Sequence, residues 1–432
     1  MASILIKGGR VIDPANYIDG GRDLLIRDGI VGEVGENLSE DGADRVVDAS
    51  GLIVVPGLID LHVHFRQPGH EHKETIETGS RAAAMGGYTT VCAMPNTNPA
   101  VDNEVVVEYV KLMAARAGLC NVLPIGAATA GQKGERLSDI GSMARAGIVA
   151  VSEDGKSVAG SALLKTAMKY ASQFGLPMFS HCEDADLAGS GQMNAGARAA
   201  LLGLNGIPND SEEVIVARDI ILANATGCRL HVCHISTEGA VWQLRSAKSR
   251  QYAVTGEAAP HHFTLTDEDV PGDYDANFKM NPPLRSAADR AAVIRGLADG
   301  TIDCIATDHA PHHYDEKNVE FANAPNGVVG LETAFALAYT GLALTNALSP
   351  LTLIEKMSLN PARILGINRG ALSRGLPADV SIFDTREEYA IDPALFASKA
   401  RNTPFAGRRV RGRLKYTILG GKVVVDNGVI RD

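Results

Sequence analysis

The stretch Asp60-Leu61-His62-Val63-His64-Phe65-Arg66 directly follows the apolar run Ile53-Val54-Val55-Pro56-Gly57-Leu58-Ile59. A short apolar run of this kind predicts a buried strand. Alternate side chains of a strand point to the same side, so we expect the rings of His62 and His64 to lie together at the strand's end. Paired imidazoles suit a divalent transition metal such as zinc, although a lone His-x-His pair also occurs as ordinary buried polar residues.

Seven further strand-like segments follow, with helical patterns between them. The predicted strands are 58–64, 89–94, 122–127, 148–152, 177–181, 230–235, 252–257 and 302–307, and the predicted helices include 75–85, 104–117, 161–174, 213–226, 237–249 and 287–298. This alternation predicts an α/β fold, a parallel (β/α)₈ barrel of the TIM type. A doubly wound open sheet is the alternative, but no Gly-x-Gly-x-x-Gly sequence follows the first strand.

The two ends of the chain differ from its middle. Short alternating segments separated by Gly and Asp turns fill residues 1–55, and similar segments return near the C-terminus, where Gly420-Gly421 joins the last two. We predict that both ends build one small composite β-sandwich domain. The predicted division is 1–55 for the N-terminal part of the sandwich, 56–365 for the barrel and 366–432 for the C-terminal part.

Composition narrows the classes of function. The 432 residues are 45% hydrophobic and 21% charged, as in a globular enzyme, and the net charge of −10 argues against a nucleic-acid partner. Without a signal-like N-terminal segment or a long apolar run, we expect a cytoplasmic protein with no membrane partner. The six cysteines form no Cys-x-x-Cys pair and are expected to be buried reduced thiols, with Cys182 and Cys233 facing away from the neighbouring histidines.

Metal-binding side chains fall at the predicted strand ends, where barrel enzymes carry their chemistry. The candidates are His62, His64, Asp154, His181, His234 and Asp308. Six ligands exceed the need of one tetrahedral metal, so we expect two ions about 3.5–4 Å apart that share a carboxylate and a bridging hydroxide nucleophile. Asp308 could both bind one metal and relay a proton. The pair His261-His262 beside Pro260 is expected to be a structural turn.

These segments resemble the amidohydrolase superfamily and, within it, the class I (bacterial-type) dihydroorotases. The resemblance is carried by His62-Val63-His64-Phe65-Arg66-Gln67-Pro68-Gly69, Met94-Pro95-Asn96-Thr97, Ser152-Glu153-Asp154-Gly155, Lys279-Met280-Asn281-Pro282-Pro283-Leu284-Arg285, Thr307-Asp308-His309-Ala310-Pro311-His312 and Gly330-Leu331-Glu332-Thr333. It implies a zinc enzyme that reversibly cyclises N-carbamoyl-L-aspartate to dihydroorotate in pyrimidine biosynthesis.

The resemblance also implies a role for each residue. Its zinc ligands would be His62, His64, His181, His234, bridging Asp154, and Asp308, which would also be the catalytic acid and base. The substrate carboxylate would be bound by Arg66, Asn96 and His312, and the ring by Asn281. A planar guanidinium suits a carboxylate because it donates two parallel hydrogen bonds. One departure is Pro325-Asn326-Gly327, where the family has Pro-Phe-Gly in a loop expected to cover the substrate.

Alternatives remain for the bridge, the substrate and the class of protein. Lys156, two residues past Asp154, could be a carboxylated bridging lysine, as in hydantoinases and allantoinases. Another cyclic amidase, an allantoinase or dihydropyrimidinase, is the nearest enzyme alternative, and Arg66 argues for a substrate that bears a carboxylate. An inactive scaffold for aspartate transcarbamoylase is disfavoured because all six ligands are present. We expect a homo-oligomer, and an active enzyme that also associates with aspartate transcarbamoylase stays possible from the sequence.

Overall fold

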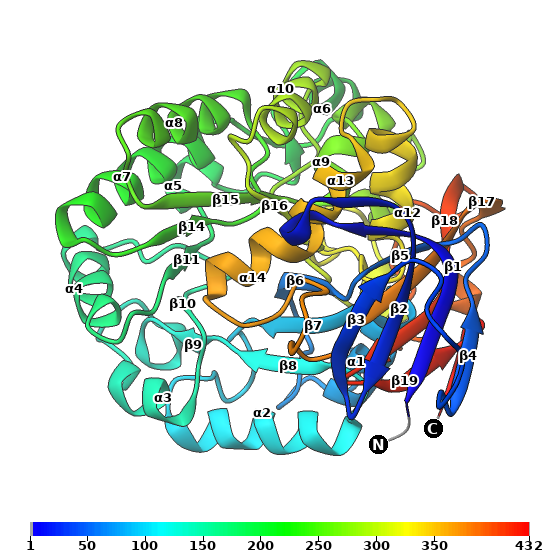
Figure 1. Cartoon of the computed structure of the whole chain (residues 1–432). Coiled ribbons are helices and arrows are strands. Elements are labelled where there is room, and N and C mark those ends of the chain that lie inside the picture. The colour runs from blue at the N-terminus through cyan, green and yellow to red at the C-terminus, as the bar shows by residue number, and fades with distance from the viewer. Residues whose placement is uncertain (1–2, 432) are drawn as a thin grey trace.

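The computed structural model describes residues 3–431, and its middle forms a closed ring of parallel strands (Figure 1). The ring consists of β6 (Leu58–Val63), β7 (Tyr88–Ala93), β8 (Asn121–Pro124) continued as β9 (Gly126–Ala127), β10 (Val151–Ser152), β11 (Met178–Ser180), β14 (Leu230–Val232), β15 (Val254–Ala258) and β16 (Cys304–Ile305). Neighbouring strands pair in parallel within two arcs, β6-β7-β8 and β9-β10-β11-β14-β15-β16, and an isolated parallel bridge between Val63 and His309 joins the last arc to the first. The predicted (β/α)₈ barrel is confirmed.

Several barrel strands are shorter than the sequence predicts; β14, for example, covers only Leu230–Val232 of the predicted 230–235. Of the predicted strands 148–152 and 302–307, only β10 and β16 keep strand geometry. After Ile305 the backbone leaves the ladder and reaches Asp308 with φ 50°, outside the range of a strand. The apolar pattern continues through this segment because it stays buried, so the pattern alone overestimates the strand.

The ring closes between its last strand and its first. The His64 N–H donates to the His309 carbonyl at 2.8 Å. Beside this contact the buried Asp60 carboxylate accepts the Thr307 N–H at 3.0 Å, the Thr307 hydroxyl at 2.6 Å and the His62 N–H at 3.1 Å. One fully buried side chain therefore holds the first and last strands together.

Most helices lie around the outside of the ring, whereas α14 (Asn360–Leu365) lies across one end of it and packs on the core inside the strands (Figure 1). The ends of the helices follow local sequence. The helices are α1 (Ile76–Met85), α2 (Glu104–Ala117), α3 (Ile140–Ala146), α4 (Ser161–Ser172), α7 (Asp210–Thr226), α8 (Glu238–Ser249), α10 (Ala287–Ala298), α12 (Ala334–Ala338), α13 (Pro350–Ile354) and α14 (Asn360–Leu365). The Asn103 side chain accepts the N–H groups of Val105 and Val106 and starts α2, and Gly118 ends it with φ 61°.

Shorter elements fill the connections. These are α5 (Ala185–Ala188), α6 (Ala197–Leu202), α9 (Pro260–Thr264), α11 (Tyr314–Lys317), the strand pair β12 (Met193–Asn194) and β13 (Gly206–Ile207), the 3₁₀ turns Pro14–Asn16, Ala130–Gln132, Asp267–Asp269, Ala276–Phe278 and Pro393–Leu395, and the π-helical turns Tyr339–Ala343 and Glu355–Leu359. Most of them lie in loops after barrel strands, so they shape the rim where the strands end.

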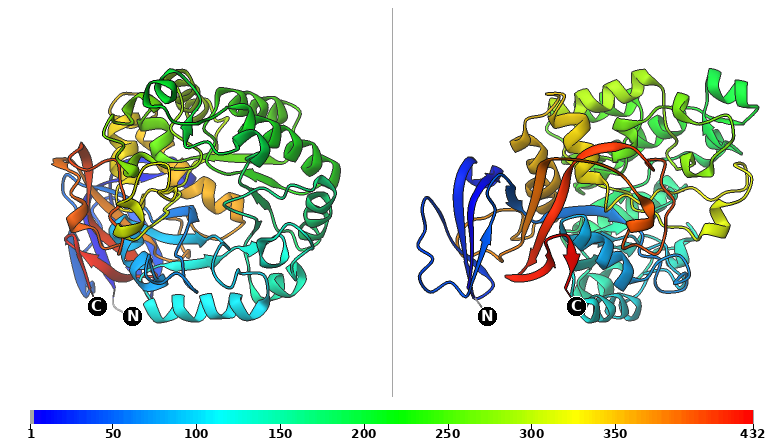
Figure 2. Two further views of the ribbon diagram at one scale, coloured as in Figure 1. Left: turned by 180° about the vertical axis from the view of Figure 1, so that it is seen from behind. Right: turned by 90° about the vertical axis from the view of Figure 1, so that its right-hand side faces the viewer.

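Both ends of the chain join one nine-stranded sheet beside the barrel. Its strands are β1 (Ile4–Asp13), β2 (Ile18–Arg27), β3 (Ile30–Gly35), β4 (Arg45–Asp48), β5 (Ile53–Pro56), β17 (Val380–Ala390), β18 (Arg409–Leu419), β19 (Lys422–Asp426) and β20 (Val429–Ile430). The two ends meet where β5 pairs with β17, with Val54 opposite Ile382. The N-terminal and C-terminal strands form two layers (Figure 2) around a common apolar core, which confirms the composite sandwich.

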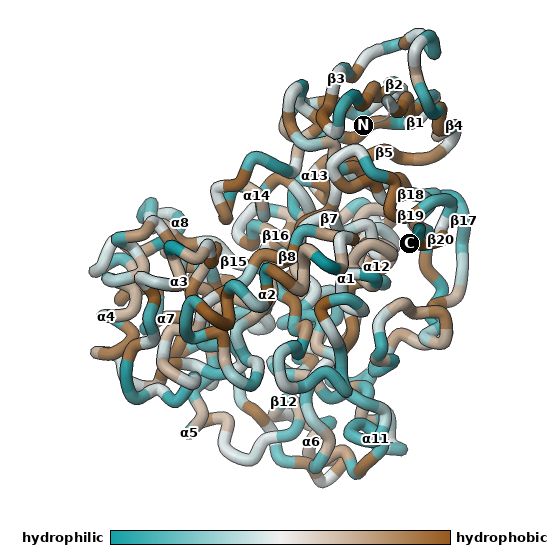
Figure 3. Tube along the Cα trace, turned by 90° about the horizontal axis from the view of Figure 1, so that it is seen from below, coloured by the Kyte–Doolittle hydropathy of each residue, from teal (hydrophilic) through white to brown (hydrophobic). Residues whose placement is uncertain are grey.

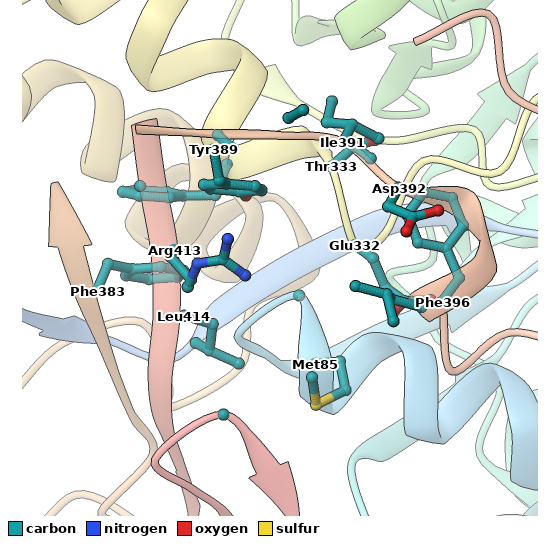
Figure 4. Close-up of a pocket in the computed structure, with 17 residues that line it drawn as sticks. Met85, Glu332, Thr333, Phe383, Tyr389, Ile391, Asp392, Phe396, Arg413 and Leu414 are labelled. Atoms are coloured by element: carbon teal, nitrogen blue, oxygen red, sulfur yellow. The ribbon is translucent and has the colours of Figure 1, made fainter. Parts of the chain in front are cut away.

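The sandwich and the barrel meet along an aromatic junction. Figure 3 shows the sandwich strands at one side of the molecule, away from α7 and α8. At the junction the Phe335 and Phe383 rings stack with their centroids 3.8 Å apart, and the Arg413 guanidinium lies 4.0 Å from the Tyr389 ring centre. A cavity of about 170 Å³ opens beside these residues (Figure 4). Its lining contains no histidine or cysteine.

Two expectations from composition can be compared with the structure. All six cysteines are free and buried, as predicted. Among the described residues, no helix has both the length and the apolar character needed to cross a membrane.

We predict that Asp60→Ala destabilises the protein by about 1–3 kcal/mol, because it leaves the buried Thr307 donors without an acceptor. Asp60→Asn is the matched control: burial raises the pKa of Asp60 to about 7, so a neutral amide is a close replacement. The measurement is denaturant unfolding of both variants beside the wild type. Equal stability of the Ala and Asn variants would contradict this role.

Candidate metal centre

The predicted site residues gather in one pocket at the carboxyl ends of the barrel strands. The pocket has a volume of about 290 Å³ and is lined by His64, Arg66, Asn96, Gln132, Asp154, Gly155, Lys156, His181, His234, Asn281, Asp308, Ala310, His312, Asn326 and Gly327. His62 lies just beneath it and is fully buried. Residues from six different strand ends therefore meet in one place, as the order of the strands predicts.

Asp154 lies at the centre of the four histidines. Its carboxylate oxygens are 3.4 Å from His62 Nε2, 3.5 Å from His64 Nε2, 3.5 Å from His181 Nδ1 and 3.6 Å from His234 Nε2. One buried carboxylate thus faces one ring nitrogen of every candidate histidine. This arrangement suits a carboxylate that is shared between two metal ions.

The donors separate into two groups of the size that a metal ion needs. Ligand atoms of His62, His64 and Asp308 lie within 4.8 Å of one another, and so do those of Asp154, His181 and His234. Asp308 Oδ1 is 3.1 Å from His64 Nε2 and 3.4 Å from His62 Nε2. Imidazole nitrogens and carboxylate oxygens are the usual donors to zinc.

Two buried atoms at the centre have no hydrogen-bond partner in the protein. They are Nε2 of His62 and Oδ1 of Asp154, and they face each other. Buried polar atoms are nearly always paired, so unpaired ones that point into a single space call for an external partner. A divalent cation bound between them would accept both lone pairs. The residues present therefore fit a metal centre.

The charges at the centre reinforce this fit. Burial alone would raise the pKa of the Asp154 carboxyl, but His62 and the other imidazoles hold it well below its usual value. Burial likewise opposes ionisation of Asp308, and His62 and His64 keep the pKa of that carboxyl low. The carboxylates therefore stay ionised, and a divalent cation can take the place of protons on the imidazoles.

The four predicted substrate-binding residues lie around the metal centre. Arg66 Nε donates to the Pro311 carbonyl at 3.2 Å, and its Nη2 lies 3.5 Å from His312 Nε2. Asn96 Oδ1 is 2.9 Å from His64 Nδ1, and Asn281 Nδ2 donates to Glu183 at 2.7 Å. All four residues line the pocket, and each is also held by a contact to the protein.

The structure favours Asp154 over Lys156 as the shared ligand. Asp154 is 2% exposed and touches the four histidines, whereas Lys156 is exposed at the pocket mouth. Glu153 turns away from the centre, as expected, and its carboxylate accepts the Thr129 N–H at 3.0 Å.

The sequence reasoning missed three polar residues near the centre. Glu257, which lies in β15, has an oxygen 2.7 Å from His62 Nδ1, and Glu183 has an oxygen 3.1 Å from His181 Nε2. The Gln132 amide donates to the Asp154 carbonyl at 2.8 Å. A charged residue within an otherwise apolar barrel strand was the available signal for Glu257. No spacing rule indicates Glu183 or Gln132.

One expectation for the surrounding residues is wrong. Cys233 does not face away: its Sγ lies within 4.8 Å of the ligand atoms of His62 and Asp154. The chain leaves strand geometry after Val232, so the alternation rule no longer applies to its side chain. Burial raises the pKa of the Cys233 thiol, which favours the protonated form, a poor metal ligand.

His261 and His262 form the start of short helix α9 and do not line the pocket.

Three site residues have left-handed backbone conformations. Arg66, His234 and Asp308 have φ of 62°, 32° and 50°, respectively. Such residues cost of order 1 kcal/mol each and concentrate at functional sites. Each lies just past a strand end, where the turn directs its side chain into the pocket. These unfavourable backbone conformations are therefore what directs the three side chains into the pocket.

Sequence comparison identifies a family that matches this geometry. Residues 51–240 match a family model described as dihydro-orotase-like. A dihydroorotase from Pelotomaculum thermopropionicum is 53% identical over 428 residues, which cover 99% of this chain and 100% of the relative. A dihydroorotase from Acetivibrio thermocellus is 50% identical over 427 residues, with 99% and 100% covered.

Solved structures of a hydantoinase and a dihydropyrimidinase share this fold. The L-hydantoinase (dihydropyrimidinase) from Arthrobacter aurescens superposes with a TM-score of 0.90 at 26% identity, covering 100% of this chain and 98% of that one. The dihydropyrimidinase from Brevibacillus agri gives 0.86 at 21% identity, covering 99% and 96%, and shows the fold alone.

We predict that zinc added to metal-free protein raises its Tm, because a ligand that binds only the folded state stabilises it by mass action. His181→Ala should reduce this shift, and His313→Ala, which alters an exposed histidine, should leave it unchanged. The measurement is thermal unfolding with and without zinc. If the Tm of the wild-type protein did not change when zinc is added, the result would contradict a metal centre at this site.

Proposed function

The chain belongs to the dihydroorotase family of the amidohydrolase superfamily, and on this premise we propose that it cyclises N-carbamoyl-L-aspartate reversibly to dihydroorotate. The observation that carries the substrate assignment is the Arg66 guanidinium, which lines the same pocket as the metal-binding residues. Both compounds bear a carboxylate, which a guanidinium recognises by two parallel hydrogen bonds. The reaction is a step of pyrimidine biosynthesis, and dihydroorotate is hydrolysed in the reverse direction.

We propose zinc as the metal, with two ions per chain. His62, His64 and Asp308 would hold one ion, His181 and His234 the other, and Asp154 would bind both. The two donor groups and the unpaired His62 and Asp154 atoms support this assignment. Bound zinc would act as a Lewis acid. It would also lower the pKa of a bound water to about 7, so that this water is a nucleophile at neutral pH.

The remaining residues orient the substrate. Arg66, Asn96 and His312 would bind the carboxylate that persists in both compounds. The His312 Nε2–H is directed to the Asn326 carbonyl at 2.8 Å, so the ring is held by the loop that contains Pro325-Asn326-Gly327. The contact uses the backbone of Asn326, which explains how this position can differ from the family's Phe. Asn281 would contact the ring.

Asp308 is proposed as the proton carrier. In the hydrolytic direction, water adds to the ring carbonyl carbon and the carbon–nitrogen bond breaks. Asp308 would accept the proton that the water loses and deliver it to the departing nitrogen. The imidazoles of His62 and His64 keep the pKa of its carboxyl low, so Asp308 is in the ionised form that a proton acceptor must have.

Further proposals concern the setting of the enzyme. Exposed apolar side chains on neighbouring helices, Ile221 of α7 and Trp242 of α8, support self-association as a homo-oligomer.

A cytoplasmic location is supported by the free cysteines, and association with aspartate transcarbamoylase is kept as a proposal from the family resemblance. The domain bounds 1–55, 56–365 and 366–432 stay a proposal: the change of sheet between β5 and β6 supports the first boundary, and the end of α14 at Leu365 supports the second.

We predict that zinc-loaded protein hydrolyses dihydroorotate but neither allantoin nor dihydrouracil. Arg66→Ala should lower kcat/KM for dihydroorotate by about 10²–10³-fold with its metal content intact, because two charge-assisted hydrogen bonds are lost. Arg66→Lys should fall between, and Arg250→Ala, an exposed arginine, should be unaffected. The measurement is steady-state kinetics with metal analysis. Turnover of allantoin or dihydrouracil, or full activity of Arg66→Ala, would favour another cyclic amidase, and no turnover of any substrate would favour a scaffold.

We also predict that Asp154→Ala loses bound metal, whereas Lys156→Ala keeps it, because only Asp154 reaches the four histidines. The measurement is zinc content per chain after gel filtration. Loss of metal in the Lys156 variant, or its dependence on bicarbonate, would instead indicate a carboxylated lysine.

A further inference from the structure

Two carboxylates outside the proposed ligand set, one buried (Glu257) and one partly buried (Glu183), each contact a different candidate ligand. We propose that Glu257 and Glu183 are positioning residues and that each one controls the affinity of a different metal position. The inference rests on the proposed two-metal centre and goes beyond it, because it assigns separate control to the two halves.

Glu257 fixes the His62 ring from below the centre. It is 1% exposed, and its Oε1 lies 2.7 Å from His62 Nδ1 and accepts the His234 N–H at 3.3 Å. Its Oε2 lies 3.0 Å from His231 Nε2, and the other nitrogen of that buried ring lies 2.9 Å from the Thr255 hydroxyl. A continuous set of hydrogen bonds thus leads from the candidate ligand to the wall of the barrel.

This contact determines which nitrogen of His62 can bind metal. An ionised carboxylate can only accept, so His62 must donate its Nδ1–H to Glu257. The lone pair then lies on Nε2, which is the buried atom without a protein partner that faces Asp154. Such a carboxylate also raises the basicity of the imidazole, and loss of a partner of this kind typically weakens metal binding.

Glu257 with its neighbours does not form a third metal site. Cys304 joins His231 and Glu257 within ligand-atom distance. Both Glu257 oxygens are already occupied by histidine N–H groups. Burial raises the pKa of the Cys304 thiol well above its usual value, so the thiol keeps its proton. The cluster is a hydrogen-bonded support.

Glu183 contacts His181, a candidate ligand of the second metal position. Its Oε2 lies 3.1 Å from His181 Nε2, while His181 Nδ1 lies 2.9 Å from His234 Nε2 and 3.5 Å from Asp154. The carboxylate therefore fixes the tautomer with its lone pair on Nδ1. The same oxygen accepts the Asn281 amide at 2.7 Å. Glu183 thus joins one metal position to a residue proposed to contact the substrate ring.

The two supports differ in the ligand ring that each holds. Glu257 contacts the ring of His62, and Glu183 contacts the ring of His181. Glutamine at either position keeps the side-chain length and one acceptor oxygen but removes the charge. Glu257→Gln can therefore retain the hydrogen bond from the His234 backbone. Each substitution should consequently act on one metal position.

The experiment is a zinc titration of metal-free protein against a competing chromophoric chelator. We expect Glu257→Gln to weaken one of two zinc affinities by about 10–100-fold, and Glu183→Gln to weaken the other by a similar factor. In a His181→Ala background, which leaves the position with His62 and His64, only Glu257→Gln should have an effect. In a His64→Ala background, only Glu183→Gln should have one.

Glu268→Gln, which alters an exposed glutamate, is the control and should bind zinc as the wild type does. The Tm of each metal-free variant separates a selective loss of affinity from a general loss of structure. Equal weakening of both positions by either variant, or no weakening by either, would overturn the proposal. A wild type that binds one zinc would contradict the two-metal centre. In that case only one of the two variants should weaken the affinity for that zinc. Equal weakening by both variants would again overturn separate control.

Discussion

The hydrogen bonds from Thr307 to the buried Asp60 carboxylate close the barrel, and every other feature of the site depends on that closure. Asp308 follows Thr307 directly, while His62 and His64 follow Asp60 on the neighbouring strand. Without the closure, residues separated by some 240 positions in sequence would not share a metal ion. A single buried carboxyl group therefore supports both the fold and the geometry of the candidate centre.

Much of this arrangement could be predicted because parallel barrel strands bring their carboxyl ends to one rim. Placing a histidine or aspartate at a strand end is enough to place it at the site, which is why the predicted metal-binding residues gather there. The contacts beneath the rim could not be predicted. Which nitrogen of His62 faces Glu257, and where Cys233 points after its strand ends, depend on backbone turns that no period in the sequence encodes.

The centre combines two costs that a protein core normally avoids. It buries ionised carboxylates among imidazoles, and it holds Arg66, His234 and Asp308 in left-handed conformations. In the metal-free protein the carboxylates are paired with the buried histidines, which hold their pKa low, and a bound cation would take over that pairing. The apolar core of the surrounding barrel offsets these unfavourable contributions to the free energy of folding. Rigid strands then keep the donors in place when the cation is absent.

The pairing of β5 with β17 has a consequence for synthesis on the ribosome. Val54 and its partner Ile382 are far apart along the chain, so the N-terminal strands emerge long before their neighbours do. At ordinary elongation rates the interval is roughly 20–60 s. During that time the open edge of β5 can pair with other chains, a hazard of any uncovered strand. The sandwich is therefore completed last, and the nascent chain needs protection until its final strands arrive.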